Sequence, residues 1–304
     1  MSAKLIGGLC INTERSIKRP MRDISTDGCE MLGKGAHGEV YRLAPDTMVK
    51  VYYPGTDTDR IKRELELARK AFVMGIPTAI PFDLVRVGER YGAVFELLNA
   101  IPISDYIRDS EERTDEFISK SVKLLKQLHS QSAAPGDLPS MRKNTITWLE
   151  NIKDRFRSVI YDKLSEFLRD IPETLTLLHG DVNPGNFMMS DGELMLIDMD
   201  TLSTGDPIFE LATLYVTYRQ FPKINELSVS MFGLTVEKAA RMWDSILKKY
   251  TGSQKREYLD KIEESSLILG CIRVIDYMNR HPELPDQEKA VQICVEDISR
   301  CYNV

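Results

Sequence analysis

Two stretches of the sequence are the most informative about the fold: residues 178–188, LHGDVNPGNFM, and residues 194–200, LMLIDMD. In each stretch an apolar run typical of a buried strand adjoins polar residues, and the Asp-Gly pair between the stretches predicts a hairpin turn. Strand ends hold loop side chains in place, so Asp181, Asn186 and Asp198 are expected to face one site. Carboxylate and amide oxygens are the ligands that Mg2+ prefers, usually together with substrate phosphates. The pattern therefore predicts a magnesium phosphate site.

Composition is that of a globular protein. The chain has 304 residues, of which 42% are hydrophobic and 28% are charged, and its net charge is -6. This length suits one large or two ordinary domains, and the acidic balance argues against nucleic acid as a partner. Five cysteines without a CxxC pair argue against a zinc site and a disulfide framework. Because neither a signal peptide nor an apolar run near ~20 residues is evident, we expect a cytoplasmic protein with no membrane contact.

A glycine-rich segment lies near the N-terminus, where Gly33, Gly35 and Gly38 are spaced as GxGxxG. The motif alone is weak evidence, so its flanks decide between interpretations. A Walker loop ends in Gly-Lys-Ser or Gly-Lys-Thr, whereas glutamate follows Gly38. A dinucleotide-binding turn opens a helix, whereas residues 40–43 and 48–52 favour strands around a Pro-Asp turn. A glycine hairpin whose backbone amides approach phosphate remains, with a plain hairpin turn as the alternative.

Lys50 stands within an apolar strand, where an ammonium group is costly to bury without a partner. Residues 58–72 carry apolar side chains at helical spacing, and Glu64 on that helix is within reach of Lys50. Glu66 is the alternative partner, and a solvated charge is the alternative role for Glu64. We expect the pair between Lys50 and Glu64, which would orient the lysine towards phosphates.

The remaining pattern divides the chain into two parts. Strands at residues 80–87 and 91–98 complete a small lobe of five mostly antiparallel strands with one helix, and residues 1–25 would add at most an edge strand. Apolar spacing is helical thereafter, with helices predicted at residues 116–129, within 146–168, and at 208–218, 225–232, 235–250, 254–279 and 286–302. The expected fold class is α+β, with a β-rich lobe at residues 1–98, a connection at 99–112 and a mostly helical lobe at 113–304.

The segment after Asp200 bears on the class of substrate. A helix is predicted from Ile208, with Asp206 as its cap and Pro207 in its first turn. Protein kinases place a long activation segment at this point, where it forms a docking platform for a polypeptide. The short segment leaves little room for a peptide, so we expect a small-molecule acceptor.

Together the motifs resemble those of the aminoglycoside phosphotransferase and choline kinase-like branch of the protein kinase-like fold. The resemblance covers roughly residues 28 to 220. It departs from protein kinases in two motifs, His-Gly-Asp instead of His-Arg-Asp and Asp-Met-Asp instead of Asp-Phe-Gly, which leaves the role of Asp200 open. The matching motifs are His179-Gly180-Asp181-x-x-x-x-Asn186, Ile197-Asp198-x-Asp200 and Gly205-Asp206-Pro207-x-x-Glu210-Leu211-Ala212.

The resemblance implies a bilobal enzyme that transfers the γ-phosphoryl group of ATP to a hydroxyl of a small molecule. An aminoglycoside, choline, ethanolamine or a sugar-like compound would be the acceptor. Asp181 would accept or orient the acceptor's proton, while Asn186 and Asp198 would hold Mg2+ at the phosphates. His179 would hold the loop rather than carry a proton.

On the nucleotide side, the resemblance assigns the α- and β-phosphates to Lys50, which Glu64 would brace beneath the glycine hairpin. Adenine would bind backbone groups at Glu96 and Leu98, in the segment between the lobes. Other functions stay open: a catalytically silent nucleotide-binding module, a metal-dependent hydrolase that uses the same loop carboxylates, or a protein kinase. The sequence predicts neither the identity of the acceptor nor the oligomeric state.

Overall fold

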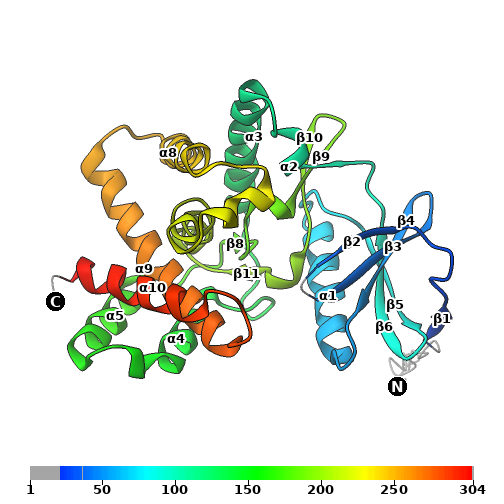
Figure 1. Ribbon diagram of the computed structural model, residues 1–304, viewed down its shortest axis with the longest axis horizontal. Helices are drawn as coiled ribbons and strands as arrows, with labels where there is room; N and C mark the ends of the chain where they lie inside the picture. The colour runs from blue at the N-terminus through cyan, green and yellow to red at the C-terminus, as the bar shows by residue number, and fades with distance from the viewer. Residues whose placement is uncertain (1–20, 36, 303–304) are drawn as a thin grey trace, which may run out of the picture.

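The computed structural model describes residues 21–35 and 37–302 (Figure 1). A β-sheet lobe is followed by a larger, mostly helical lobe, which confirms the α+β fold class. The predicted extension at residues 1–25 lies mostly outside the described residues. None of the helices described is both long and apolar enough to cross a membrane.

The small lobe is built on a six-stranded sheet with the strand order β1-β5-β6-β4-β3-β2. Neighbouring strands are antiparallel, except that β1 pairs in parallel with β5. The sequence predicts five strands, and β1 is an additional edge strand too short to show a period of two. The strands are β1 (Arg22–Ile24), β2 (Met31–Lys34), β3 (Gly38–Ala44), β4 (Thr47–Tyr52), β5 (Pro81–Val87) and β6 (Arg90–Glu96).

Helix α1 (Thr58–Val73) lies between this sheet and the large lobe (Figure 1). Asp57 caps the helix, because its carboxylate accepts a hydrogen bond from the Asp59 N–H. Ile61, Leu65 and Ala68 recur at helical spacing and are buried. The helix therefore fixes Glu64, which lies on the same buried side, beside the sheet.

The large lobe contains helices and two small sheets. Its strands are β7 (Ile101–Pro102), β9 (Phe187–Ser190) and β10 (Glu193–Leu196) in one sheet and β8 (Leu177–Leu178) and β11 (Ser203–Thr204) in the other. Its helices are α2 (Ile103–Tyr106), α3 (Glu111–His129), α4 (Met141–Asn151), α5 (Ser158–Asp170), α6 (Ile208–Tyr215), α7 (Phe221–Ile224), α8 (Val236–Thr251), α9 (Arg256–Arg280) and α10 (Gln287–Cys301).

Shorter helical turns join these elements. The segment predicted as a helix at residues 225–232 is a 3-10 turn, and α6 continues into a π-helical turn. The 3-10 turns are η1 (Lys153–Arg155), η2 (Pro184–Asn186), η3 (Met199–Thr201) and η5 (Glu226–Phe232), and the π turn is η4 (Val216–Gln220).

The largest hydrophobic cluster extends through both lobes. It includes Leu65 of α1, Phe117 of α3, Phe187 of β9 and Trp243 of α8. Phe117 and Phe187 pack edge to face, with ring centroids 5.3 Å apart. A second cluster joins α4, α5, α9 and α10. Because this apolar packing is continuous between the lobes, it supports the loops that lie between them. The division of the chain at residues 99–112 stays a prediction.

Candidate active site

Lys50, in the middle of β4, faces two carboxylates from distant parts of the chain. Its Nζ lies 2.7 Å from Glu64 Oε1 on α1 and 3.3 Å from Asp198 Oδ1, which follows β10. Burial alone would lower the pKa of Lys50, but the charges of Asp198 and Glu64 outweigh burial and raise this pKa. Glu66, the alternative partner, pairs instead with Lys70 at 3.2 Å. Lys50 is thus a fixed cation between the lobes.

Three carboxylates cluster beside this cation. One oxygen atom each from Glu64, Asp198 and Asp200 lies within 4.8 Å of the others. Burial raises the pKa of Asp200 to about 7, and the negative charges of Asp198 and Glu64 contribute to the rise. A bound divalent cation would relieve this concentration of negative charge, and its oxygen donors suit Mg2+. Asp200 thereby joins the candidate metal ligands.

The backbone at Asp198 is unusual. Its φ of 61° and ψ of 63° lie in the left-handed region, which aspartate tolerates better than most residues. Such strained residues cluster at functional sites. The Ile197 N–H donates to the Asn186 carbonyl at 3.0 Å, so Asn186 lies against the chain just before Asp198. The two predicted metal ligands therefore come from neighbouring segments.

Asp181 is held by hydrogen bonds to both of its carboxylate oxygens. Arg273 Nη2 on α9 lies 2.9 Å from Asp181 Oδ1. The amide nitrogens of Asn183 and Asn186 each lie 3.2 Å from Asp181 Oδ2. Because Asn186 donates through its amide nitrogen, its amide oxygen takes no part in these bonds, and its role as a metal ligand stays a prediction.

Buried polar groups fix the backbone of this loop. Glu210 at the start of α6 is fully buried and accepts from the N–H groups of His179 at 2.7 Å and Gly180 at 3.0 Å. Burial opposes its charged form, but His129 and the N–H of His179 keep the pKa of Glu210 below its ordinary value. His179 accepts from the Asp181 N–H and contacts the Ile197 carbonyl. His179 therefore holds the loop.

Glycine is required within this loop at Gly180. Its φ is +85°, and a Cβ there would lie 2.4 Å from the Thr201 carbonyl oxygen. The close approach explains why glycine stands between His179 and Asp181. The loop is also tied to η3 by the Thr201 hydroxyl, which donates to the His179 carbonyl at 2.8 Å.

The glycine-rich segment forms the hairpin between β2 and β3, and the Gly35 N–H donates to the Gly38 carbonyl at 2.9 Å. A Cβ on Gly38 would lie 2.3 Å from a carbonyl oxygen of β4, whereas the other two glycines of the motif face open space. Burial lowers the pKa of His37 in this hairpin, and the positive charges of Arg60 and Lys50 add to the effect. The hairpin therefore lies close to Lys50.

The backbone between the lobes is partly used by the sheet. The Glu96 N–H donates to the Ile80 carbonyl at 2.9 Å, and the Glu96 carboxylate accepts from the Ile80 N–H at 3.2 Å. The Leu97 N–H donates to Asp46 at 2.8 Å. The Glu96 N–H is therefore committed to the sheet, and a contact between the Glu96 backbone and a base stays a prediction. The contact at Leu98 stays a prediction.

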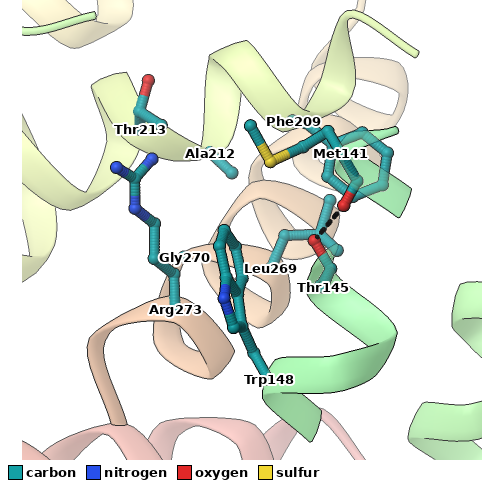
Figure 2. Close-up of a pocket in the computed structure, with 9 residues that line it drawn as sticks. All are labelled: Met141, Thr145, Trp148, Phe209, Ala212, Thr213, Leu269, Gly270 and Arg273. Carbon is teal, nitrogen blue, oxygen red and sulfur yellow. Dashed lines mark hydrogen bonds between the residues drawn. The ribbon is translucent and has the colours of Figure 1, made fainter. Parts of the chain in front are cut away.

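Arg273 was not found from the sequence. It is separated from Asp181 by 92 positions and lies within the apolar run 267–275, LILGCIRVI. A lone charge in an apolar run is the signal that identified Lys50, and it applies here equally. The Arg273 guanidinium lies 5.8 Å from the centre of the Trp148 ring, and Figure 2 shows both side chains beside a cavity between α4, α6 and α9. The cavity is about 10 Å³, which is room for about one water molecule.

Comparisons with known proteins identify the family and the fold of this chain. The pattern of the phosphotransferase enzyme family matches residues 28–231. No curated protein matches the sequence. The ADP-bound aminoglycoside phosphotransferase APH(2'')-Ib is 18% identical, with 89% of this chain and 93% of that chain covered and a TM-score of 0.59. A choline/ethanolamine kinase family protein from Mesorhizobium loti is 15% identical, with 89% and 87% covered and a TM-score of 0.60.

A third solved structure has the same fold. The streptomycin-ATP-APH(2'')-IIa ternary complex is 19% identical, with 88% of this chain and 90% of that chain covered and a TM-score of 0.56. At these identities the three likenesses establish the fold, and the family pattern extends over more than half of the chain. The chain therefore belongs to the phosphotransferase enzyme family.

Proposed function

We propose that this protein is a Mg2+-dependent kinase that transfers the γ-phosphoryl group of ATP to a hydroxyl of a small molecule. The convergence of Lys50, Glu64 and Asp198 from β4, α1 and the end of β10 carries the proposal. These groups come from both lobes and meet where a nucleotide between the lobes would place its phosphates. Two of the structural relatives hold ADP or ATP.

On the nucleotide side, each residue has a separate task. Lys50, held by Glu64, binds oxygens of the α- and β-phosphates, and backbone N–H groups of the glycine hairpin cover them. Asp198, Asp200 and the amide oxygen of Asn186 hold the metal ion. When bound, Mg2+ neutralises phosphate charge that develops during transfer.

On the acceptor side, Asp181 orients the acceptor hydroxyl towards the γ-phosphorus. A bond forms between the acceptor oxygen and phosphorus while the bond from phosphorus to the bridging oxygen of ADP breaks. The hydroxyl proton passes to Asp181. Positioning and charge neutralisation supply most of the rate in such reactions, so a site with few side chains suffices.

The chain after Asp198 supports a small acceptor rather than a polypeptide. It passes through η3 and β11, and α6 already begins at Ile208. Strand β11 pairs with β8 next to the loop of Asp181. The described residues in this stretch leave no extended segment on which a peptide would dock.

The test is a screen for ADP release from MgATP. The acceptors are aminoglycosides, choline, ethanolamine, amino sugars, sugars and homoserine, and the Asp181→Asn variant is the control. We expect at least one acceptor to raise ADP release above the rate with water, and only with the wild type. MgATP binding without ADP release would indicate a silent binding module, and phosphate release without nucleotide would indicate a hydrolase. Either outcome would refute the proposal.

A further inference from the structure

We infer that Arg273 is a positioning residue for phosphoryl transfer, which holds the carboxylate of Asp181 so that one oxygen faces the acceptor. The inference rests on the proposed function. Arg273 reaches the loop from α9, a helix that has no part in the sequence motifs of the site. Among the described residues, the other side chains that donate to the Asp181 carboxylate belong to the loop itself, whereas Arg273 comes from outside it.

The guanidinium of Arg273 binds two successive residues of the loop. Its Nη1 donates to the Gly180 carbonyl oxygen, and its Nη2 donates to Asp181 Oδ1 at 2.9 Å. A planar guanidinium with two parallel donors fixes direction as well as distance. The contact therefore sets the rotation of the Asp181 side chain relative to its own backbone.

The hydrogen bonds of Asp181 leave one place for an acceptor. A carboxylate offers about four lone pairs, two on each oxygen. Both amides, those of Asn183 and Asn186, donate to Oδ2, whereas Arg273 is the donor to Oδ1 among the described residues. The remaining lone pair on Oδ1 is thus the position for the acceptor hydroxyl. The hydroxyl would then lie beside the Arg273 guanidinium.

Packing of α9 holds Arg273 in this position. A Cβ at Gly270, one turn earlier on α9, would lie 2.6 Å from Val216 Cγ2, so glycine allows α9 to pack closely on the end of α6. The ring of Trp148 lies 5.8 Å from the guanidinium and backs it from α4 (Figure 2). Three helices therefore fix the side chain before an acceptor binds.

Stability alone does not account for this arginine. The Arg273 and Asp181 side chains are 27% and 42% exposed, and ion pairs open to solvent stabilise a fold by little. An arginine within an apolar run of a packed helix is costly to place. A role in positioning Asp181 would explain why the arginine is present despite this energetic cost, because misplacing a reacting group by about 1 Å can lower the rate about 100-fold.

The test compares Arg273→Gln with the wild type in steady-state ADP release from MgATP, with water and then with any acceptor from the screen. We expect kcat to fall about 10- to 100-fold while KM for MgATP is unchanged. Arg273→Lys, which keeps the charge but not the paired donors, should give an intermediate kcat. In the Asp181→Asn background, Arg273→Gln should cause little further loss, because the arginine acts through that carboxylate.

Arg256→Gln is the matched control, because Arg256 lies on α9 and pairs with Asp260 at 2.7 Å far from the loop. It should keep the wild-type kcat. Wild-type kcat in Arg273→Gln, or an equal loss in the Asp181→Asn background, would overturn the inference. If Arg273→Gln fails to fold, wild-type kcat in Arg273→Lys would overturn it and an intermediate value would support it. A wild type that releases no ADP overturns the proposed function as well.

Discussion

The proposed nucleotide side of the site and its proposed acceptor side are built in different ways. On the nucleotide side, Lys50 is enclosed with Glu64, whose side chain is 6% exposed, and their charges are paired before any ligand binds. On the proposed acceptor side, Asp181 is half-exposed and is held by two asparagines of its own loop and by Arg273 from a C-terminal helix. The difference teaches that the groups of the proposed nucleotide side are paired with one another, whereas the geometry of the proposed acceptor side also depends on α9, a helix that carries none of the sequence motifs.

The largest effect expected is on turnover in Asp181→Asn. Losing a general base or orienting group lowers kcat about 100- to 10,000-fold. Affinity for MgADP should stay at the wild-type value, because Asp181 lies on the acceptor side. Calorimetric titration of MgADP beside a steady-state assay separates the two quantities. If Asp181→Asn lowered the affinity for MgADP as well as kcat, Asp181 could not be assigned to the acceptor side alone.

The nucleotide side was more predictable from sequence because its signals are local. An ammonium in an apolar strand demands a partner, and Lys50 lies 14 positions from Glu64 in the chain. Asn186 and Asp198 flank one predicted hairpin. The sequence predicts β1 only as an optional edge strand, because three residues show no period. The fold class is predicted because apolar residues recur with a period of two in the first part of the chain and with helical spacing in the second part.

The acceptor side was less predictable because its contacts are distant in sequence. Arg273 meets Asp181 only once α9 has packed against α6, and no spacing rule connects the two residues. Glu210 belongs to a quoted motif, but its role became evident only from its bonds to the loop backbone. A buried acid among backbone N–H groups is a tertiary feature that a single sequence does not display.

The next effect concerns Mg2+-dependent nucleotide binding in Asp198→Asn. We expect affinity for ATP in the presence of Mg2+ to fall at least about tenfold, because replacing the carboxylate removes charge from the metal site. Without Mg2+, the affinities of variant and wild type should be similar. Asp191→Asn is the matched control, because Asp191 lies in a hairpin turn whose φ of 49° asparagine tolerates. An unchanged Mg2+ dependence would exclude Asp198 as a ligand.

Two glycines of the hairpin should differ in stability. Gly38→Ala places a Cβ 2.3 Å from the Val51 carbonyl oxygen, and the resulting shift should cost about 1–3 kcal/mol in the free energy of unfolding. Gly35 faces open space, so Gly35→Ala should stay within about 0.5 kcal/mol of the wild type. Urea unfolding measures both. Equal destabilisation would mean that the hairpin packs differently.

The smallest effect is a dependence of stability on pH that arises from Asp200. Burial and the charges of Asp198 and Glu64 raise the pKa of Asp200 from 3.8 to about 7 in the folded protein. The folded state therefore binds this proton more tightly than the unfolded chain does. The resulting stabilisation is complete below the unfolded value of 3.8 and is lost as the pH rises through about 7.

Asp200→Asn carries no titrating proton at this position, so it isolates the effect. In metal-free buffer, the melting temperature of the wild type should fall by a few degrees relative to the variant as the pH rises from 3.8 to about 7, and should then level off. Added Mg2+ should reverse the fall in the wild type at high pH, because the cation replaces the proton in neutralising the cluster. If the melting temperatures of the wild type and the variant differ by the same amount at every pH, the charges around Asp200 do not destabilise the fold. The contrast drawn between the two sides would then lose its electrostatic part.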